Sequence, residues 1–255
     1  MTQELSPCPA CGSAEVLFSA RRQEYLCEAC GHRWPFGQPA AVAWPPGLEP
    51  ADLPIYLAAP LASLLAERHP RVRLHWLVDC AEIAVRWGVA VALAEVLHAN
   101  AGALPEPVVA RLREQIERPT LGKWLGILEA LSAARPAEPL LAAGVFELYR
   151  DAIAPRFRGE GEGGTLETSL LLLRNHLAHG AGLRTEAARA LLATHEPGVF
   201  DLLRAVARAT GGTMVLAIEQ GRARSLAGPR PVAVTCPEGL RAVPDGPWLV
   251  GASTA

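Results

Sequence analysis

Apolar residues recur at steps of three and four positions through most of this chain, the spacing that aligns side chains on one face of an α-helix. Leu121, Leu125 and Leu128 form one such stripe. The same spacing predicts helices over residues 72–97, 108–116, 120–134, 141–153, 165–179, 185–194 and 197–209. The segment 72–97 is apolar on most of its faces, as expected of a central helix.

The pattern changes at both ends of the helical region, and this change predicts four parts. Residues 1–36 form a cysteine-rich module, and residues 37–52 are a linker rich in Pro, Gly and Ala. A helical domain follows over residues 53–210. Residues 211–255 begin with the β-type stretch TMVLAIEQGRARSL, which predicts a hairpin around Gly221 and then an irregular tail. The predicted fold class is therefore mainly α, with a small ribbon before the helices and a small β region after them.

Composition narrows the class of protein. Half of the 255 residues are apolar, enough for a sizeable core, and the formal net charge of −2 argues against a generally basic nucleic-acid coat. The longest uncharged apolar stretch, which starts at Leu53, is too short to span a bilayer and contains two prolines. Met1 leads into polar residues without the pattern of a signal peptide. We therefore expect a cytoplasmic protein with no membrane partner.

Four cysteines near the N-terminus fall in two C-x2-C pairs, Cys8 with Cys11 and Cys27 with Cys30. Fifteen residues separate the pairs, and two such knuckles at this distance can close a tetrahedral site of four thiolates. The stretch between them can form a short hairpin, and residues 5–36 resemble the zinc ribbon family. The prediction is one structural zinc ion per chain.

Two disulfides are the rival account of these cysteines, but nothing in the sequence suggests export to an oxidising compartment. His32 lies just beyond the last cysteine, where the four thiolates already fill the coordination shell. The module carries more glutamates than arginines, and a zinc ion with four thiolates adds negative charge. We therefore expect the ribbon to pack on the main domain or on a protein partner rather than to bind nucleic acid.

The stretch LLLLRNHLAHG, residues 170–180, concentrates the candidate chemistry of the helical region. Thr165 is the predicted N-cap of its helix, and Gly180 stands where a left-handed C-cap residue is wanted. Arg174 and His179 form an R-x4-H pair, which by itself is common by chance. The pattern is much rarer by chance when Asn175 is included, because the chain has only two asparagines and one directly follows this arginine.

In this context the stretch resembles the signature helix of the HEPN superfamily, whose helical domains carry Arg-polar-x3-His near the end of a long helix. The family pattern maps onto Arg174, Asn175 and His179, while His176 is an additional histidine outside it. The resemblance implies a metal-independent endoribonuclease, with RNA as its substrate, that acts as a homodimer and serves as a toxin or defence effector. Other members of the family are inactive and serve as binding scaffolds.

The residue types suit RNA cleavage through the 2′-hydroxyl, which needs a proton acceptor, a proton donor and a cation for the phosphate. Histidine can fill either proton role, and arginine offers a permanent charge and a planar fork. Five residues advance 500° on an ideal helix, which leaves Arg174 and His179 about 140° apart. A two-fold dimer, with a cleft lined by both copies, would ease this problem.

A structural interpretation of the same residues stays open. Basic side chains in the last turns of a helix complement the negative end of its dipole, and a glycine caps it. The ribbon and the helices would then form a non-catalytic regulatory or binding subunit of a larger assembly. The intact Arg, Asn and His favour the enzyme, whereas the mild acidity of the chain favours the subunit.

Overall fold

The protein was analysed as a computed structural model, which describes most of the helical region and parts of both ends. The described residues are 8, 13, 15–19, 24–35, 43–117, 120–138, 144–158, 164–179, 183–211, 213–220, 222–228, 231–234 and 246–251. The chain forms two compact units, Met1–Val42 and Ala43–Ala255.

The first unit contains a three-stranded antiparallel sheet within its described residues. Strands β1 (Val16–Ser19) and β2 (Glu24–Cys27) pair as a hairpin, and β3 (Arg33–Pro35) adds to the other side of β2. The hairpin predicted between the two cysteine pairs is therefore confirmed. The buried core among these described residues consists of Cys8, Val16 and Cys27, with Tyr25 packed against them.

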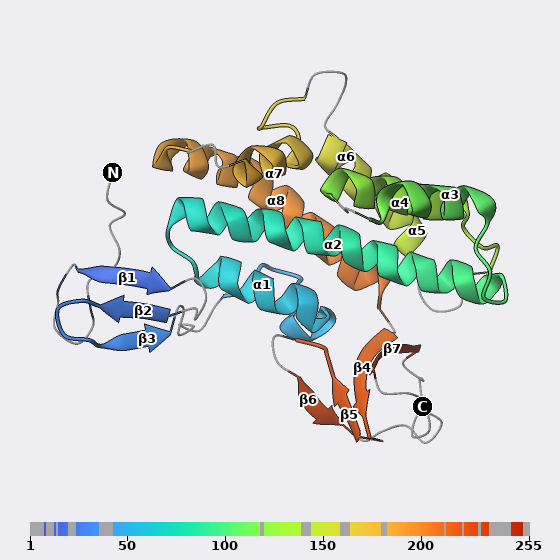
Figure 1. Cartoon of the computed structure of the whole chain (residues 1–255), viewed down its shortest axis with the longest axis horizontal. Helices are drawn as coiled ribbons and strands as arrows, with labels where there is room; N and C mark the ends of the chain where they lie inside the picture. The colour runs from blue at the N-terminus through green and yellow to red at the C-terminus, as the bar shows by residue number, and fades with distance from the viewer. Residues whose placement is uncertain are drawn as a thin grey trace. The chain divides into compact units, whose positions relative to one another are not determined.

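The second unit is built mainly from helices. Their bounds are η1 (Pro50–Asp52), α1 (Ile55–Ala66), α2 (Pro70–Ala99), α3 (Glu106–Gln115), α4 (Leu121–Ala133), α5 (Gly144–Leu148), η2 (Tyr149–Ile153), α6 (Ala154–Arg158), α7 (Leu170–Ala178) and α8 (Thr185–Ala209). Figure 1 shows the 30-residue α2 running through the unit, and α1, α4 and α8 pack against it. Its neighbours on several sides explain why α2 is apolar on most faces, as predicted. Among the described residues, no helix combines the length and the apolar character needed to cross a membrane.

The predicted start of the helix that carries Arg174 was wrong. The motif helix α7 begins after Ser169, not after Thr165, and the Ser169 hydroxyl accepts a hydrogen bond from the Leu172 amide. Residues 165–168 form a turn instead. The Ser169 hydroxyl also donates to the Phe157 carbonyl, so a tertiary contact selects this cap.

The two helices predicted on either side of Pro197 are one helix, α8. A proline inside a helix removes one backbone hydrogen bond and crowds the preceding turn. The apolar stripe of α8 continues through this point, however, with Leu192 and Val199 both buried in the core. Burial of the whole stripe therefore outweighs the local cost of the proline. The helix predicted over residues 141–153 also continues further than expected, through η2 and α6 to Arg158, and its residues 141–143 lie outside the described part.

The predicted linker over residues 37–52 was wrong in its second half. Leu48 is completely buried in the core of the second unit, and Trp44 packs against the same core. Arg204 of α8 donates a hydrogen bond from Nε to the Pro46 carbonyl at 2.9 Å. Residues 43–52 thus belong to the second unit, although their Pro and Gly content is typical of a linker.

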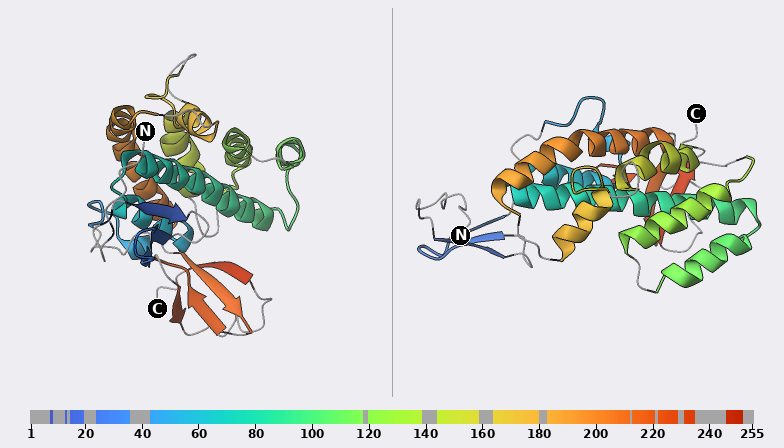
Figure 2. Two further views of the ribbon diagram at one scale, coloured as in Figure 1. Left: turned by 60° about the vertical axis from the view of Figure 1, so that its left-hand side comes forward. Right: turned by 90° about the horizontal axis from the view of Figure 1, so that it is seen from above.

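The C-terminal region forms an antiparallel sheet of strand order β6-β5-β4-β7 within the described residues; its strands are labelled in Figure 1, and Figure 2 shows the same sheet from two other directions. Its strands are β4 (Thr213–Glu219), β5 (Arg222–Ser225), β6 (Val232–Val234) and β7 (Gly246–Gly251). The predicted hairpin is confirmed by β4 and β5. The tail predicted to be irregular instead supplies β6 and β7, which pair with the two outer edges of that hairpin. Edge strands with unpaired backbone groups recruit such partners even where the local sequence is rich in Pro and Gly.

The contact between α5 and α8 allows a direct test of the packing. A Cβ atom at Gly144 would lie 2.9 Å from the Ala209 Cα, closer than real side chains approach. We expect Gly144→Ala to destabilise the second unit by about 1–3 kcal/mol, because the backbones must separate. Gly122→Ala is the matched control, since its Cβ would meet only Leu171 at 3.9 Å. Urea unfolding followed by circular dichroism measures both variants, and equal midpoints would contradict this packing.

Candidate functional site

Three cysteines of the first unit come together around one point. The Sγ atoms of Cys8, Cys27 and Cys30 all lie within 4.8 Å of one another, and those of Cys8 and Cys30 are 3.7 Å apart. Thiolates around a tetrahedral zinc ion, with Zn–S bonds of about 2.3 Å, lie about 3.8 Å apart. These three residues could therefore hold a metal ion. The fourth predicted ligand, Cys11, lies outside the described residues.

Local backbone geometry explains how the second cysteine pair is shaped. The Cys27 amide donates to the His32 carbonyl at 2.8 Å, and the Gly31 amide donates to the Cys27 carbonyl at 2.9 Å. Gly31 has a φ of 71°, a left-handed conformation that favours glycine. This turn brings the side chains of Cys27 and Cys30 to the same side. His32 is exposed.

The chain has two further cysteines, Cys80 and Cys236, outside the paired motif. Cys80 is completely buried in α2, and burial raises the pKa of its thiol. A protonated buried thiol is inert, so Cys80 has a packing role. Cys236 lies outside the described residues.

The second candidate site lies where α7 meets α2. Leu170 and Leu173 anchor α7 in the core, and the half-buried Arg174, Asn175 and His176 follow on its last turns. His179 is the exposed C-cap residue, and its amide donates to the Asn175 carbonyl at 3.1 Å. Gly180 lies outside the described residues.

Arg174 is held by a carboxylate that the sequence analysis did not single out. Its Nε donates to Glu82 Oε2 of α2 at 3.1 Å, and the Glu82 side chain is largely buried. Arg86, one turn further along α2, binds the other oxygen of the same carboxylate. The Arg86 guanidinium also lies 5.9 Å from the centre of the Trp124 ring. Glu82 therefore shares its charge between two arginines of different helices.

Two more titratable groups extend this arrangement along α2. His75 and Asp79 precede Glu82 by seven and three residues, so all three lie on one face of the helix. Partial burial raises the pKa of Asp79, and the negative charge of Glu82 raises it further. The positive charges of His75 and Arg174 act in the opposite direction. A polar face of α2 thus lies within electrostatic range of the motif arginine.

The structure does not bring all of the predicted catalytic residues into contact with one another. Among the described residues, no hydrogen bond links Arg174 to Asn175 or to His179. The structure instead brings Arg174 to Glu82, which is 92 positions away in the chain. A glutamate one turn before an arginine, on a helix that is apolar on most of its faces, was the available sequence signal.

Comparisons with protein-family models, with curated proteins and with solved structures gave no match. The resemblance to the HEPN superfamily therefore depends on residues 170–180 and on the helical character of the domain around them.

Proposed function

We propose that the α2–α7 cluster, formed by Glu82, Arg174, Asn175 and His179, is the active site of a metal-independent endoribonuclease of HEPN type. The observation that carries this proposal is the contact between Glu82 and Arg174. Glu82 engages the Nε of the guanidinium, whose two terminal nitrogens make no hydrogen bond within the described residues. An arginine oriented in this way offers its outer edge to a phosphate group.

The proton transfers of RNA cleavage are assigned to His179. Its exposed position at the end of α7 gives an RNA strand access to the imidazole. One histidine removes the proton of the 2′-hydroxyl, and a second, from another copy of the chain, protonates the leaving 5′-oxygen. Asn175 is assigned to orienting the phosphate, and His176 is an accessory residue. The products carry a 2′,3′-cyclic phosphate, because the neighbouring hydroxyl is the nucleophile.

The proposed two-fold homodimer forms through α7. Leu170 and Leu173 are buried within the chain, whereas Leu172 is 39% exposed on the same helix. An exposed leucine beside the proposed site is suited to contact with a second copy.

We expect Leu172→Glu to convert the dimer to a monomer, because the contact would then bury two like charges. Light scattering at micromolar concentration measures the mass of each species. Ile116→Glu is the matched control, since Ile116 is also exposed but lies at the end of α3. A wild-type protein that is already monomeric would contradict the composite site.

We further propose that the cysteine cluster binds one structural zinc ion through Cys8, Cys11, Cys27 and Cys30. The spacing of the three described Sγ atoms supports this, and a reducing compartment such as the cytoplasm would keep the thiolates available. The zinc has no assigned part in RNA cleavage.

A second candidate function is favoured by the same ion pair. A salt bridge between Arg174 and Glu82 also ties α7 to α2, which is what a non-catalytic scaffold requires. In that case the ribbon and the helices form a regulatory or binding subunit of a larger assembly.

Incubation of the purified protein with labelled single-stranded RNA, in the absence of divalent ions, tests the enzyme directly. Cleavage to products with cyclic phosphate ends supports it. Cleavage that depends on added magnesium contradicts the assigned mechanism, and a protein inert toward all RNA supports the scaffold.

A further inference from the structure

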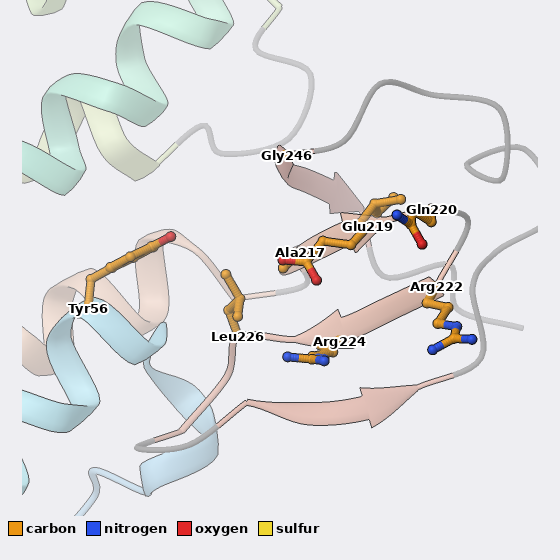
Figure 3. A pocket seen from close by; sticks show the side chains of 9 residues that line it. Tyr56, Ala217, Glu219, Gln220, Arg222, Arg224, Leu226 and Gly246 are labelled. Carbon is orange, nitrogen blue, oxygen red and sulfur yellow. The ribbon is translucent and has the colours of Figure 1, made fainter.

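The outer face of the C-terminal sheet carries an open cavity of about 610 Å³. We call it the sheet groove and define it by Tyr56, Glu219, Arg222, Arg224 and Leu226. Figure 3 shows these side chains around it, with Tyr56 contributed by α1 and the others by β4, β5 and the residue after β5. The groove shares no residue with the α2–α7 cluster.

Strand geometry places two positive charges on this face. Arg222 and Arg224 are exposed, and Ala223 between them is buried, so the two arginines point to the same side of β5. Residues two positions apart on a strand are separated by about 6.6 Å. This is close to the separation of successive phosphates in an extended nucleic-acid strand.

The arginines of the groove lack the carboxylate partners that several arginines of the unit have. Arg73 and Arg204 pair with carboxylates of α8, whereas Arg222 and Arg224 form no ion pair or hydrogen bond within the described residues. Glu219 is directly across from Arg222 in the strand register, yet the two side chains do not pair. Among the described lining residues, two arginines and one glutamate give a net charge of +1, on a chain whose net charge is −2.

Tyr56 adds an aromatic surface at one end of the groove. Its side chain is 47% exposed, although it lies in the first turn of α1. The Ile55 amide donates to the Leu226 carbonyl at 2.5 Å, and the Gly228 amide donates to the Leu53 carbonyl at 2.8 Å. These bonds fix the start of α1 to the end of β5, so Tyr56 keeps its position beside the groove.

We propose that the sheet groove binds a nucleotide, either free or as part of a single-stranded nucleic acid. Arg222 and Arg224 would bind phosphate oxygens through their planar forks. The Tyr56 ring would stack on a base, an interaction available to every base. Glu219 would accept a hydrogen bond from a sugar hydroxyl or a base amino group. The volume lies within the range of small-ligand sites. This proposal does not depend on RNA cleavage at α7.

Binding of a fluorescent single-stranded RNA with 2′-O-methyl riboses tests the proposal, because this probe cannot be cleaved through the 2′-hydroxyl. We expect the Arg222→Ala/Arg224→Ala double variant to weaken binding at least about tenfold at low salt. The plot of the logarithm of the association constant against the logarithm of the salt concentration should become less steep by about 1.4, since each phosphate contact to a single strand contributes about 0.7 to the slope. Tyr56→Ala should weaken binding with an unchanged salt slope, because stacking releases no counterion.

Arg189→Ala is the matched control, because Arg189 is exposed on α8 away from the groove. It should leave both the affinity and the slope unchanged. Circular dichroism should show that every variant is folded, since the replaced side chains are exposed.

Competition by a mononucleotide separates the two sources of the ligand. Displacement of the probe by adenosine or uridine monophosphate at millimolar concentration supports a free nucleotide, and displacement only by an unlabelled strand supports a nucleic acid. Absence of wild-type binding to both the strand and the mononucleotides, or equal binding by the double variant, would overturn the proposal. If the wild-type protein cleaves RNA and the groove variants bind the probe normally, the nuclease proposal is supported and the nucleotide-binding proposal for the groove is contradicted.

Discussion

Arg174→Ala and His179→Ala are each expected to lower the rate of RNA cleavage by at least about a hundredfold. In the proposed mechanism, Arg174→Ala removes the cation that binds the phosphate in the transition state, and His179→Ala removes the proton-transfer group. Initial rates on a labelled single-stranded RNA, measured without divalent ions, give the size of each effect. His176→Ala should be milder, because His176 lies outside the family pattern.

Arg86→Ala is the control that separates catalysis from structure. Arg86 and Arg174 bind the same buried carboxylate, so either replacement leaves Glu82 with one remaining arginine. Their costs in stability should therefore be similar, whereas only Arg174→Ala should abolish cleavage. Urea unfolding of both variants provides the comparison.

Two results would decide against the proposed active site. If Arg174→Ala and Arg86→Ala reduce the rate equally, and in proportion to the loss of folded protein, Arg174 acts only through Glu82. If both Arg174→Ala and His179→Ala retain full activity, the active site is elsewhere in the chain.

Loss of the metal is expected to unfold the first unit while the second stays folded. Within the described residues of the first unit the buried core consists of Cys8, Val16 and Cys27, and so small a core does not offset the entropy of ordering the strands. Binding of the proposed zinc ion would supply the missing free energy, as it does in small zinc modules. Cys27→Ser should therefore lower the zinc content from about one equivalent to near zero. Compared with the wild-type protein, this variant should become more sensitive to proteolysis only within residues 1–42.

Cys80→Ala is the matched control for the zinc prediction, because it removes a buried thiol of the second unit. It should leave the zinc content unchanged. Metal analysis of the wild-type protein, purified without chelator, should find close to one equivalent of zinc. A value below about half an equivalent would contradict the site, and so would a Cys27→Ser variant with normal zinc content.

Local pattern was sufficient to predict helices α2 and α4 and the grouping of Cys8, Cys27 and Cys30. The apolar stripe of α4 and the all-round apolar character of α2 predicted both helices within one or two residues of their ends. The reason is that helical periodicity depends on neighbours three and four positions away. The knuckle at Cys27 and Cys30 was likewise predictable, because its geometry depends on a short turn that ends at Gly31.

Local pattern failed where distant segments decide the outcome. Ser169 caps α7 because it also meets Phe157, and α8 passes through Pro197 because both of its halves pack in the core. The segment 43–52 has the composition of a linker but buries Leu48. In each case, burial outweighed a local preference of a few kcal/mol or less.

The sequence by itself therefore determined the mainly helical class, the grouping of the N-terminal cysteines and the identity of the motif residues around Arg174. Only the tertiary structure decided which groups those residues meet. Glu82 reaches Arg174 across 92 positions, and Tyr56 reaches the sheet groove through hydrogen bonds between the start of α1 and the end of β5. Such pairings depend on how helices and strands pack, and periodicity within one segment contains no information about its partner in another.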